Sequence, residues 1–152
     1  MDNTFPSDLI GGLQAEAQFM ELLKNSGNTG ILKNEAKETS ELIKWDIQCT
    51  NKKGSHVRFE IKWDKMSTTT GNLALEFFGR SKPSGIDATT ADYFVFLTGD
   101  EFFIYKTDNL KKMVRAMNFR SICINNGTAY CYLMPISKVR EYTYNIVKNI
   151  WR

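Results

Sequence analysis

The sequence predicts one domain of the mixed α/β class, with a central mixed sheet flanked by helices. The chain has 152 residues, of which 42% are hydrophobic and 12% aromatic, so it can build one core of ordinary size. Helical and strand patterns alternate along it, which is typical of this class. Neither a linker nor an internal repeat divides the chain, so we expect a single domain over residues 1–152.

The first predicted elements are a helix and a hairpin. Residues 8–26 carry apolar side chains broadly at helical spacing, and a glycine follows as a stop signal. A loop or short strand over 30–37 comes next. Strands over 42–50 and 57–64 then enclose a turn at 51–54, which is the strongest hairpin signal in the chain.

Three further strands are predicted in the middle of the chain. A polar loop over 67–72 leads to a third strand over 73–78, and a long loop over 79–90 follows. Residues 93–97 read YFVFL without alternation, which predicts a strand covered on both faces. A tight turn then leads into a strand over 101–106.

The C-terminal part predicts two helices separated by a strand. The first helix spans 107–118, and a turn at 125–127 precedes a strand over 128–133. Pro135 opens a predicted terminal helix, because proline is favoured at the first helical position. Four side chains of that helix could face the core: Val139, Tyr142, Ile146 and Ile150.

The composition argues against several classes of protein. No apolar run approaches the roughly 18 residues that suggest a membrane span, and no signal peptide is apparent. The cysteines, Cys49, Cys123 and Cys131, are odd in number and lack CxxC spacing, so we expect reduced core cysteines of a cytoplasmic protein. The single histidine, His56, is expected in a turn and cannot alone supply a zinc site or histidine-based chemistry.

The charge is unevenly distributed, although the net charge is only +3. Residues 1–50 hold four basic residues against eight acidic ones, and residues 100–152 hold nine basic against four acidic. A basic C-terminal third would suit a phosphate backbone. An ordinary solvated surface would give the same balance, so the charge permits nucleic-acid binding without establishing it.

A cluster of charged residues is predicted on the hairpin. Residues 57–64 read VRFEIKWD, and strand alternation sends their apolar side chains to one face and Glu60 and Lys62 to the other. Asp46 lies fourteen residues before Glu60, in KWDIQC on the expected neighbouring strand. The pairing of these strands would bring the two carboxylates and the ammonium together.

These residue types suit Mg²⁺-dependent phosphodiester hydrolysis. Mg²⁺ prefers oxygen ligands, which Asp46, Glu60 and the main-chain carbonyl of Ile61 could supply. Lys62 could orient the attacking water or stabilise the transition state; we favour this over proton abstraction, because the adjacent carboxylates would keep its pKa high. A cross-strand ion-pair cluster on a solvated sheet face is the alternative interpretation.

The arrangement resembles the PD-(D/E)XK nuclease superfamily, which has the restriction-endonuclease-like fold. Asp46, Glu60 and Lys62 carry the resemblance, although Trp45 stands where the motif name has proline. The resemblance implies that Asp46 and Glu60 are metal ligands, that Lys62 is the catalytic lysine, and that Glu16 on the first helix assists. It covers a core of about residues 8–106 and leaves 107–152 as a C-terminal extension.

Two downstream runs also look like segments of phage and bacterial nucleases of this superfamily. TTTGNLALEF (68–77) places Glu76 on the third strand as a possible further metal ligand or water partner. KPSGIDATTADYFVF (82–96) carries Lys82 and Ser84, which could touch a phosphate, and Gly85, which would let the backbone approach closely.

The resemblance implies a Mg²⁺-dependent endodeoxyribonuclease, with Mn²⁺ expected to substitute. It implies a DNA substrate, a homodimer or higher homo-oligomer, and a cytoplasmic location in a bacterial or phage-infected cell. Restriction, homing and junction-resolving activities remain open, with small size slightly favouring the last two. The alternatives are a non-catalytic nucleic-acid-binding module that keeps the nuclease fold, and an unrelated α/β structural protein.

Overall fold

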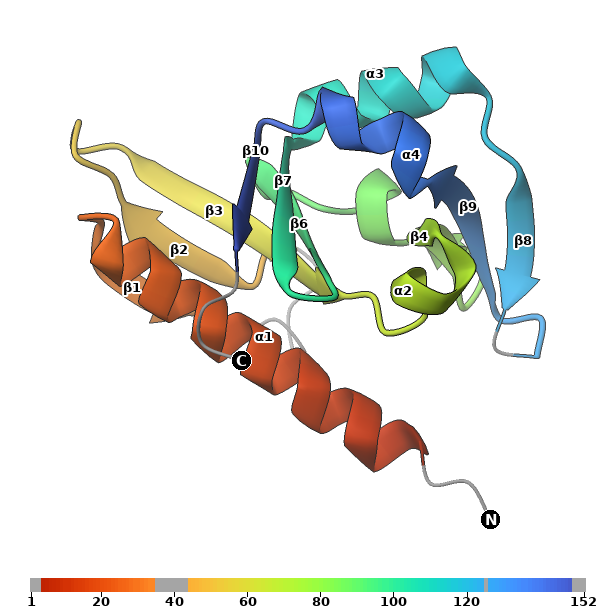
Figure 1. Ribbon diagram of the computed structural model, residues 1–152, viewed down its shortest axis with the longest axis horizontal. Coiled ribbons are helices and arrows are strands. Elements are labelled where there is room, and N and C mark those ends of the chain that lie inside the picture. The colour runs from red at the N-terminus through yellow and green to blue at the C-terminus, as the bar shows by residue number, and fades with distance from the viewer. Residues whose placement is uncertain (1–3, 35–43, 125, 149–152) are drawn as a thin grey trace.

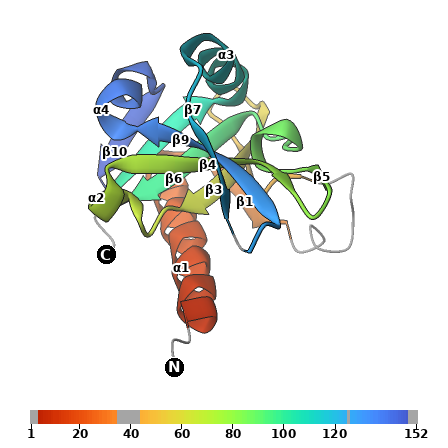
Figure 2. The same cartoon turned by 90° about the vertical axis from the view of Figure 1, so that its right-hand side faces the viewer.

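The computed structural model describes residues 4–34, 44–124 and 126–148, and it has the predicted mixed α/β architecture. The strands form two sheets, and α1 and α3 lie on opposite sides of the molecule (Figures 1 and 2). Within the described part of the chain, no helix is long and apolar enough to cross a membrane.

The larger sheet has the strand order β1-β2-β3-β6-β7-β10. Its neighbouring strands are antiparallel except β3 and β6, which run parallel, so the sheet is mixed as predicted. Its strands are β1 (Thr29–Lys33), β2 (Ile47–Thr50), β3 (His56–Trp63), β6 (Tyr93–Thr98), β7 (Glu101–Lys106) and β10 (Asn145–Lys148).

The helix α1 (Thr4–Asn25) covers one face of the larger sheet. Phe19 lies at the centre of this contact, and its ring packs edge-on against those of Phe59 and Phe102. Gly11 allows the closest approach, because a Cβ at this position would collide with the ring of Trp63 at the end of β3.

The second sheet has the order β5-β4-β9-β8 and packs with α3 (Thr107–Met117) over the opposite face of the larger sheet. Its strands are β4 (Asn72–Gly79), β5 (Lys82–Pro83), β8 (Ser121–Ile124) and β9 (Ala129–Pro135). The short helical elements are α2 (Ser67–Thr70), η1 (Gly85–Asp87), α4 (Ile136–Val139) and η2 (Arg140–Tyr142).

Strand β6 lies between the two hydrophobic cores, which confirms that it is covered on both faces. Val95 and Leu97 belong to the core under α1, whereas Phe94 and Phe96 belong to the core shared with the second sheet and α3. Residues of β3 point to the same face of the sheet as the β6 residues with which they pair. The core that each β6 residue joins therefore shows which face Glu60 and Lys62 occupy.

The predicted terminal helix is wrong beyond Val139. The chain continues through η2 into β10, which pairs antiparallel with β7. Ile146 and Val147 pack against opposite cores, which strand alternation permits and a helix does not. Ile150 lies outside the described residues.

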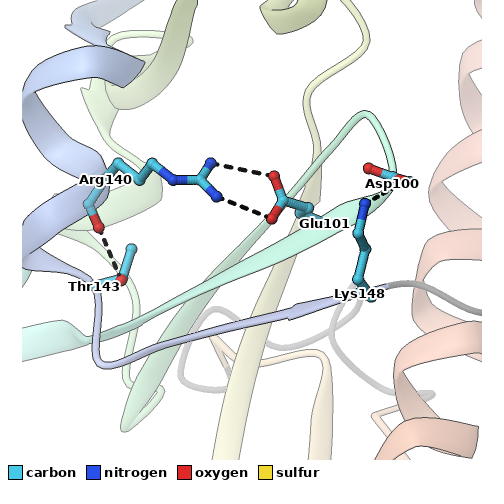
Figure 3. A network of polar contacts seen from close by, with 5 residues as sticks. All are labelled: Asp100, Glu101, Arg140, Thr143 and Lys148. Carbon is cyan, nitrogen blue, oxygen red and sulfur yellow. Dashed lines mark hydrogen bonds and ion pairs between the residues drawn. The ribbon is translucent and has the colours of Figure 1, made fainter.

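Ion pairs hold this C-terminal segment to the β6–β7 turn (Figure 3). Arg140 donates two hydrogen bonds to the carboxylate of Glu101, at 3.2 and 3.1 Å. Lys148 reaches Asp100 at 2.8 Å. The terminal segment, which includes the edge strand β10, is thereby fixed to the start of β7.

Smaller differences follow from tertiary pairing. Part of the predicted loop 67–72 is the helix α2, and the predicted third strand, β4, belongs to the second sheet. β8 was not predicted. His56 is the first residue of β3 instead of a turn residue, and Cys123 is exposed instead of lying in the core.

Candidate active site

Asp46 is fixed beside β3 by main-chain hydrogen bonds. It directly precedes β2, and its amide donates to the carbonyl of Phe59 at 2.8 Å. Its Oδ2 atom accepts a hydrogen bond of 2.7 Å from the amide of Ile61. The residue is only 6% exposed, so its carboxylate is held against the centre of β3.

The carbonyl of Ile61 points towards the same edge of β3. The N–H and C=O groups of one strand residue project to the same side in an antiparallel pair. The pairing of β2 with β3 ends at Ile47 and Phe59, so Ile61 lies beyond this ladder, and its amide binds Asp46 instead. The carboxylate and the carbonyl therefore share the end of the β2–β3 pair.

Glu60 and Lys62 lie on the face of β3 that is turned towards the second sheet. They pair in register with Phe94 and Phe96 of β6, which belong to the core on that side. Lys62 Nζ lies 3.6 Å from Glu60 Oε1, and the two side chains are 47% and 15% exposed. The site thus stands at the border of a core, partly shielded from water.

Glu76 approaches this pair from β4 of the second sheet. Burial lowers the pKa of Lys62, but the charges of Glu60, Asp46 and Glu76 outweigh it, so that its pKa is raised. Lys62 therefore stays an ammonium at neutral pH, which agrees with a positioning and electrostatic role.

Cys131 lies beside the same charges, as the cross-strand partner of Glu76 on β9. Burial, then Glu76 and Asp64, raise its pKa to about 11, while Lys62 opposes the shift. The charges of Glu76, Asp64 and Lys62 therefore all influence the pKa of this thiol.

Glu16 lies on the first helix, α1, from which it is expected to assist the site. It is buried on α1, and its Oε2 atom lies 3.0 Å from Nζ of Lys33 on β1. Lys33 pairs with Ile47, which faces α1. Glu16 therefore stands on the α1 side of the sheet, next to the strand that Asp46 precedes.

Lys82, Ser84 and Gly85 surround the end of β4. Lys82 is exposed on β5, whereas the Oγ atom of Ser84 is buried and has no hydrogen-bond partner among the described residues. Gly85 has a φ of 50°, and a Cβ there would collide with the main-chain oxygen of Glu76. The close approach expected at Gly85 is thus made to the backbone of Glu76.

Asp64 is a candidate that the sequence pattern alone did not select. Its Oδ2 atom accepts a hydrogen bond of 2.8 Å from the amide of Ala74, at the start of β4. Asp64 is the next polar residue after Lys62 in RFEIKWD. Its contact with Ala74 depends on how the second sheet packs, so the sequence alone does not predict it.

The donor set near Asp46 fits a hard divalent cation. Among the described residues, no three histidine, cysteine or acidic side chains come close enough together to hold a metal ion. Mg²⁺ needs fewer protein ligands, because it keeps several waters. The hydrogen bond from Ile61 fixes one oxygen of Asp46, and the other oxygen, Glu60 and the Ile61 carbonyl remain as candidate ligands.

Comparisons with known proteins give a single structural likeness to report. No family model and no curated protein matches the sequence. The solved structure of a bacterial homing endonuclease, I-Ssp6803I, aligns with a TM-score of 0.49 and 18% sequence identity, over 67% of this chain and 70% of that chain. Membership of the PD-(D/E)XK superfamily stays a prediction.

Proposed function

We propose that the protein is a divalent-metal-dependent endonuclease of the PD-(D/E)XK type, which hydrolyses phosphodiester bonds in DNA. The observation that carries this proposal is the fixed carboxylate of Asp46, bound to the amide of Ile61 between Glu60 and Lys62. Two acids and an ammonium on paired segments can hold a metal ion and a scissile phosphate together.

Asp46, Glu60 and the carbonyl of Ile61 would hold Mg²⁺, for which Mn²⁺ would substitute. When bound, the ion supplies an activated water and neutralises charge on the phosphate. The hydrogen bond from the Ile61 amide orients Asp46 before any metal arrives. This preorganisation favours metal binding, because the Asp46 carboxylate does not have to be ordered when the ion binds.

Lys62 would stabilise the negative charge that develops on the phosphate. Its pKa is raised because the adjacent carboxylates outweigh its burial, so the side chain stays protonated. A fixed cation in a partly shielded site stabilises a developing anion without reorganisation. Glu60 and Glu76 would hold the ammonium in place from the two sheets.

The remaining predicted roles concern DNA and assembly. Lys82 is exposed at the end of β4 and would contact a phosphate of the backbone. Glu16 would assist the metal site from the α1 side, through Lys33 and the strand beside Asp46. Because one chain carries one proposed site, cutting both strands of a duplex would require a homodimer or a higher oligomer.

Cleavage assays on three substrates test the proposal. Plasmid, single-stranded and four-way-junction DNA are incubated with the wild type in Mg²⁺, in Mn²⁺ and in EDTA. We expect cleavage with either metal and none in EDTA, and the preferred substrate separates junction resolution from homing or restriction activity.

The variant Asp46→Asn provides the sharpest comparison, because asparagine can still accept the hydrogen bond from Ile61. It should remain folded and bind DNA but lose cleavage, whereas Lys53→Ala, in the exposed β2–β3 turn, should cut normally. A wild type that binds DNA without cutting it would support the non-catalytic module instead. Equal cutting by Asp46→Asn would contradict the proposed metal site.

A further inference from the structure

The proposed site is divided between two sheets that share no hydrogen-bonded ladder at this point. Lys62 lies on β3 of the larger sheet, and Glu76 lies on β4 of the smaller one. Strand pairing cannot set the position of one relative to the other. The shared core packs the sheets together, and a directional contact between β3 and β4 adds a fixed register to this packing.

Asp64 makes that contact directly after β3 ends. Its Oδ2 atom accepts the amide hydrogen of Ala74 at 2.8 Å, so its side chain ties the end of β3 to the beginning of β4. Its own main chain is anchored separately: its amide donates to Leu97 at 2.9 Å, and its carbonyl accepts from the Ser67 hydroxyl at 2.7 Å. The carboxylate is thus held from behind while it holds β4.

The spacing of the two strands turns this contact into an alignment. Asp64 follows Lys62 by two residues, and Ala74 precedes Glu76 by two residues. Residues two apart along a strand lie on the same face, one step further along. Lys62 and Glu76 are thus equally far along the chain from the contact of Asp64 with Ala74, and the charge of Glu76 acts on Lys62.

We propose that Asp64 is a positioning residue, whose hydrogen bond to the amide of Ala74 aligns Glu76 with Lys62 across the two sheets. The inference rests on the proposed nuclease function for its catalytic consequence. The alignment itself is a structural property that can be tested without cleavage.

The contact with Ala74 requires an acceptor at this distance, whereas the amides of Ser67 and Met66 bond to the carboxylate within its own loop. Asparagine keeps an oxygen in the same place, glutamate moves the carboxylate by one methylene, and alanine removes the acceptor. Asp64→Asn should therefore preserve the alignment, while Asp64→Glu and Asp64→Ala should disturb it. Thr70→Val is a matched control in the same loop, because its hydroxyl bonds only within residues 66–72.

The first arm measures cleavage by the full chain in Mg²⁺ under single-turnover conditions. We expect Asp64→Asn and Thr70→Val to stay within about threefold of the wild type. We expect Asp64→Glu to lose about tenfold or more in rate, with DNA affinity unchanged, as misplaced catalytic groups do. The double variant Asp64→Glu with Glu76→Gln should lose no more cleavage rate than the slower of the two single variants, because both substitutions act through one contact.

The second arm is independent of activity and follows the Lys62 side-chain resonances by NMR. Glu76→Gln should shift them in the wild type and in Asp64→Asn, but should have little effect in Asp64→Glu or Asp64→Ala. The proposal would be overturned if Asp64→Asn behaved like Asp64→Glu in both cleavage rate and Lys62 resonances. It would also be overturned if the rate losses of the two single variants multiplied in the double variant. If no form cuts DNA, the nuclease proposal fails, while the NMR arm still decides the alignment.

Discussion

At the scale of single residues, the site depends on acceptors that bind main-chain amides. Asp46 accepts from Ile61, and Asp64 accepts from Ala74, so two carboxylates replace ladder hydrogen bonds where strand pairing stops. The buried amide of Ile61 would otherwise lack a partner, at a cost of about 1–3 kcal/mol. The same bonds fix the directions of the carboxylates.

The burial of Cys131 leads to a prediction about alkaline stability. Its pKa is raised from 9.0 to about 11, so between these values the unfolded thiol ionises while the folded thiol keeps its proton. The contribution of this thiol to the free energy of unfolding is therefore complete below pH 9 and is lost as the pH rises through 11. This rise in pKa corresponds to at most roughly 3 kcal/mol in the free energy of unfolding.

Denaturant unfolding of Cys131→Ala at pH 8 and pH 10.5 measures this effect. The variant should lose less stability between the two pH values than the wild type does. Cys123→Ala is the control, because that cysteine is exposed. Equal losses in Cys131→Ala and in the wild type would show that this thiol does not carry the effect.

Sequence patterns predicted the main residues of the candidate site but not their surroundings. Asp46, Glu60 and Lys62 follow from strand alternation and from one local hairpin, so their proximity was predictable. The contact of Asp64 with Ala74 depends on how a second sheet docks. Likewise, the pairing of Glu16 with Lys33 depends on how α1 crosses the first strands.

At the scale of elements, the sequence predicts helices and hairpins formed by neighbouring residues, but it does not predict the pairing of strands that lie far apart in the chain. The first helix and the hairpin of β2 and β3 were predictable because their apolar periods and turn residues are contiguous. The sequence predicts a helix where β10 forms, because the apolar residues there also fit helical spacing. Its strand form comes from pairing with β7, far away in the sequence.

The packing of α1 on β3 predicts opposite effects at two adjacent glycines. A methyl group at Gly11 would collide with the ring of Trp63, whereas a methyl group at Gly12 would meet nothing within 4 Å. Gly11→Ala should destabilise the fold by about 1–3 kcal/mol, as overpacking does. Gly12→Ala should stabilise it by up to about 1 kcal/mol through helix propensity.

Thermal or urea unfolding of the two variants compares them directly. Because both substitutions add one methyl group to the same helix, the difference isolates the contact with Trp63. Equal effects of the two substitutions would contradict the close packing of α1 against the end of β3.

At the scale of the whole molecule, the two sheets bring charges of both signs to the end of β4. The charge of Glu76 acts on Lys62, and Lys82 is exposed on the neighbouring β5. α3 lies across the molecule from α1 and carries its own exposed lysine, Lys112 (Figure 1). Under the proposed function, Lys82 and Lys112 mark two alternative surfaces for DNA.

Salt dependence of DNA binding separates the two surfaces. If Lys82 contacts a phosphate, Lys82→Ala should lower the slope of log K against log salt by about 0.9. Lys112→Ala should leave the slope unchanged. The reverse result would move the DNA-binding surface to α3.

The single-turnover cleavage rate of Lys62→Met, relative to the wild type in Mg²⁺, tests the central claim most directly. Methionine keeps the apolar stem of the side chain and removes the ammonium, so folding and DNA affinity should change little. We predict a loss of about 100-fold or more in rate, the size expected when a charge that stabilises the transition state is removed. Cleavage at the wild-type rate by Lys62→Met would contradict the proposed mechanism.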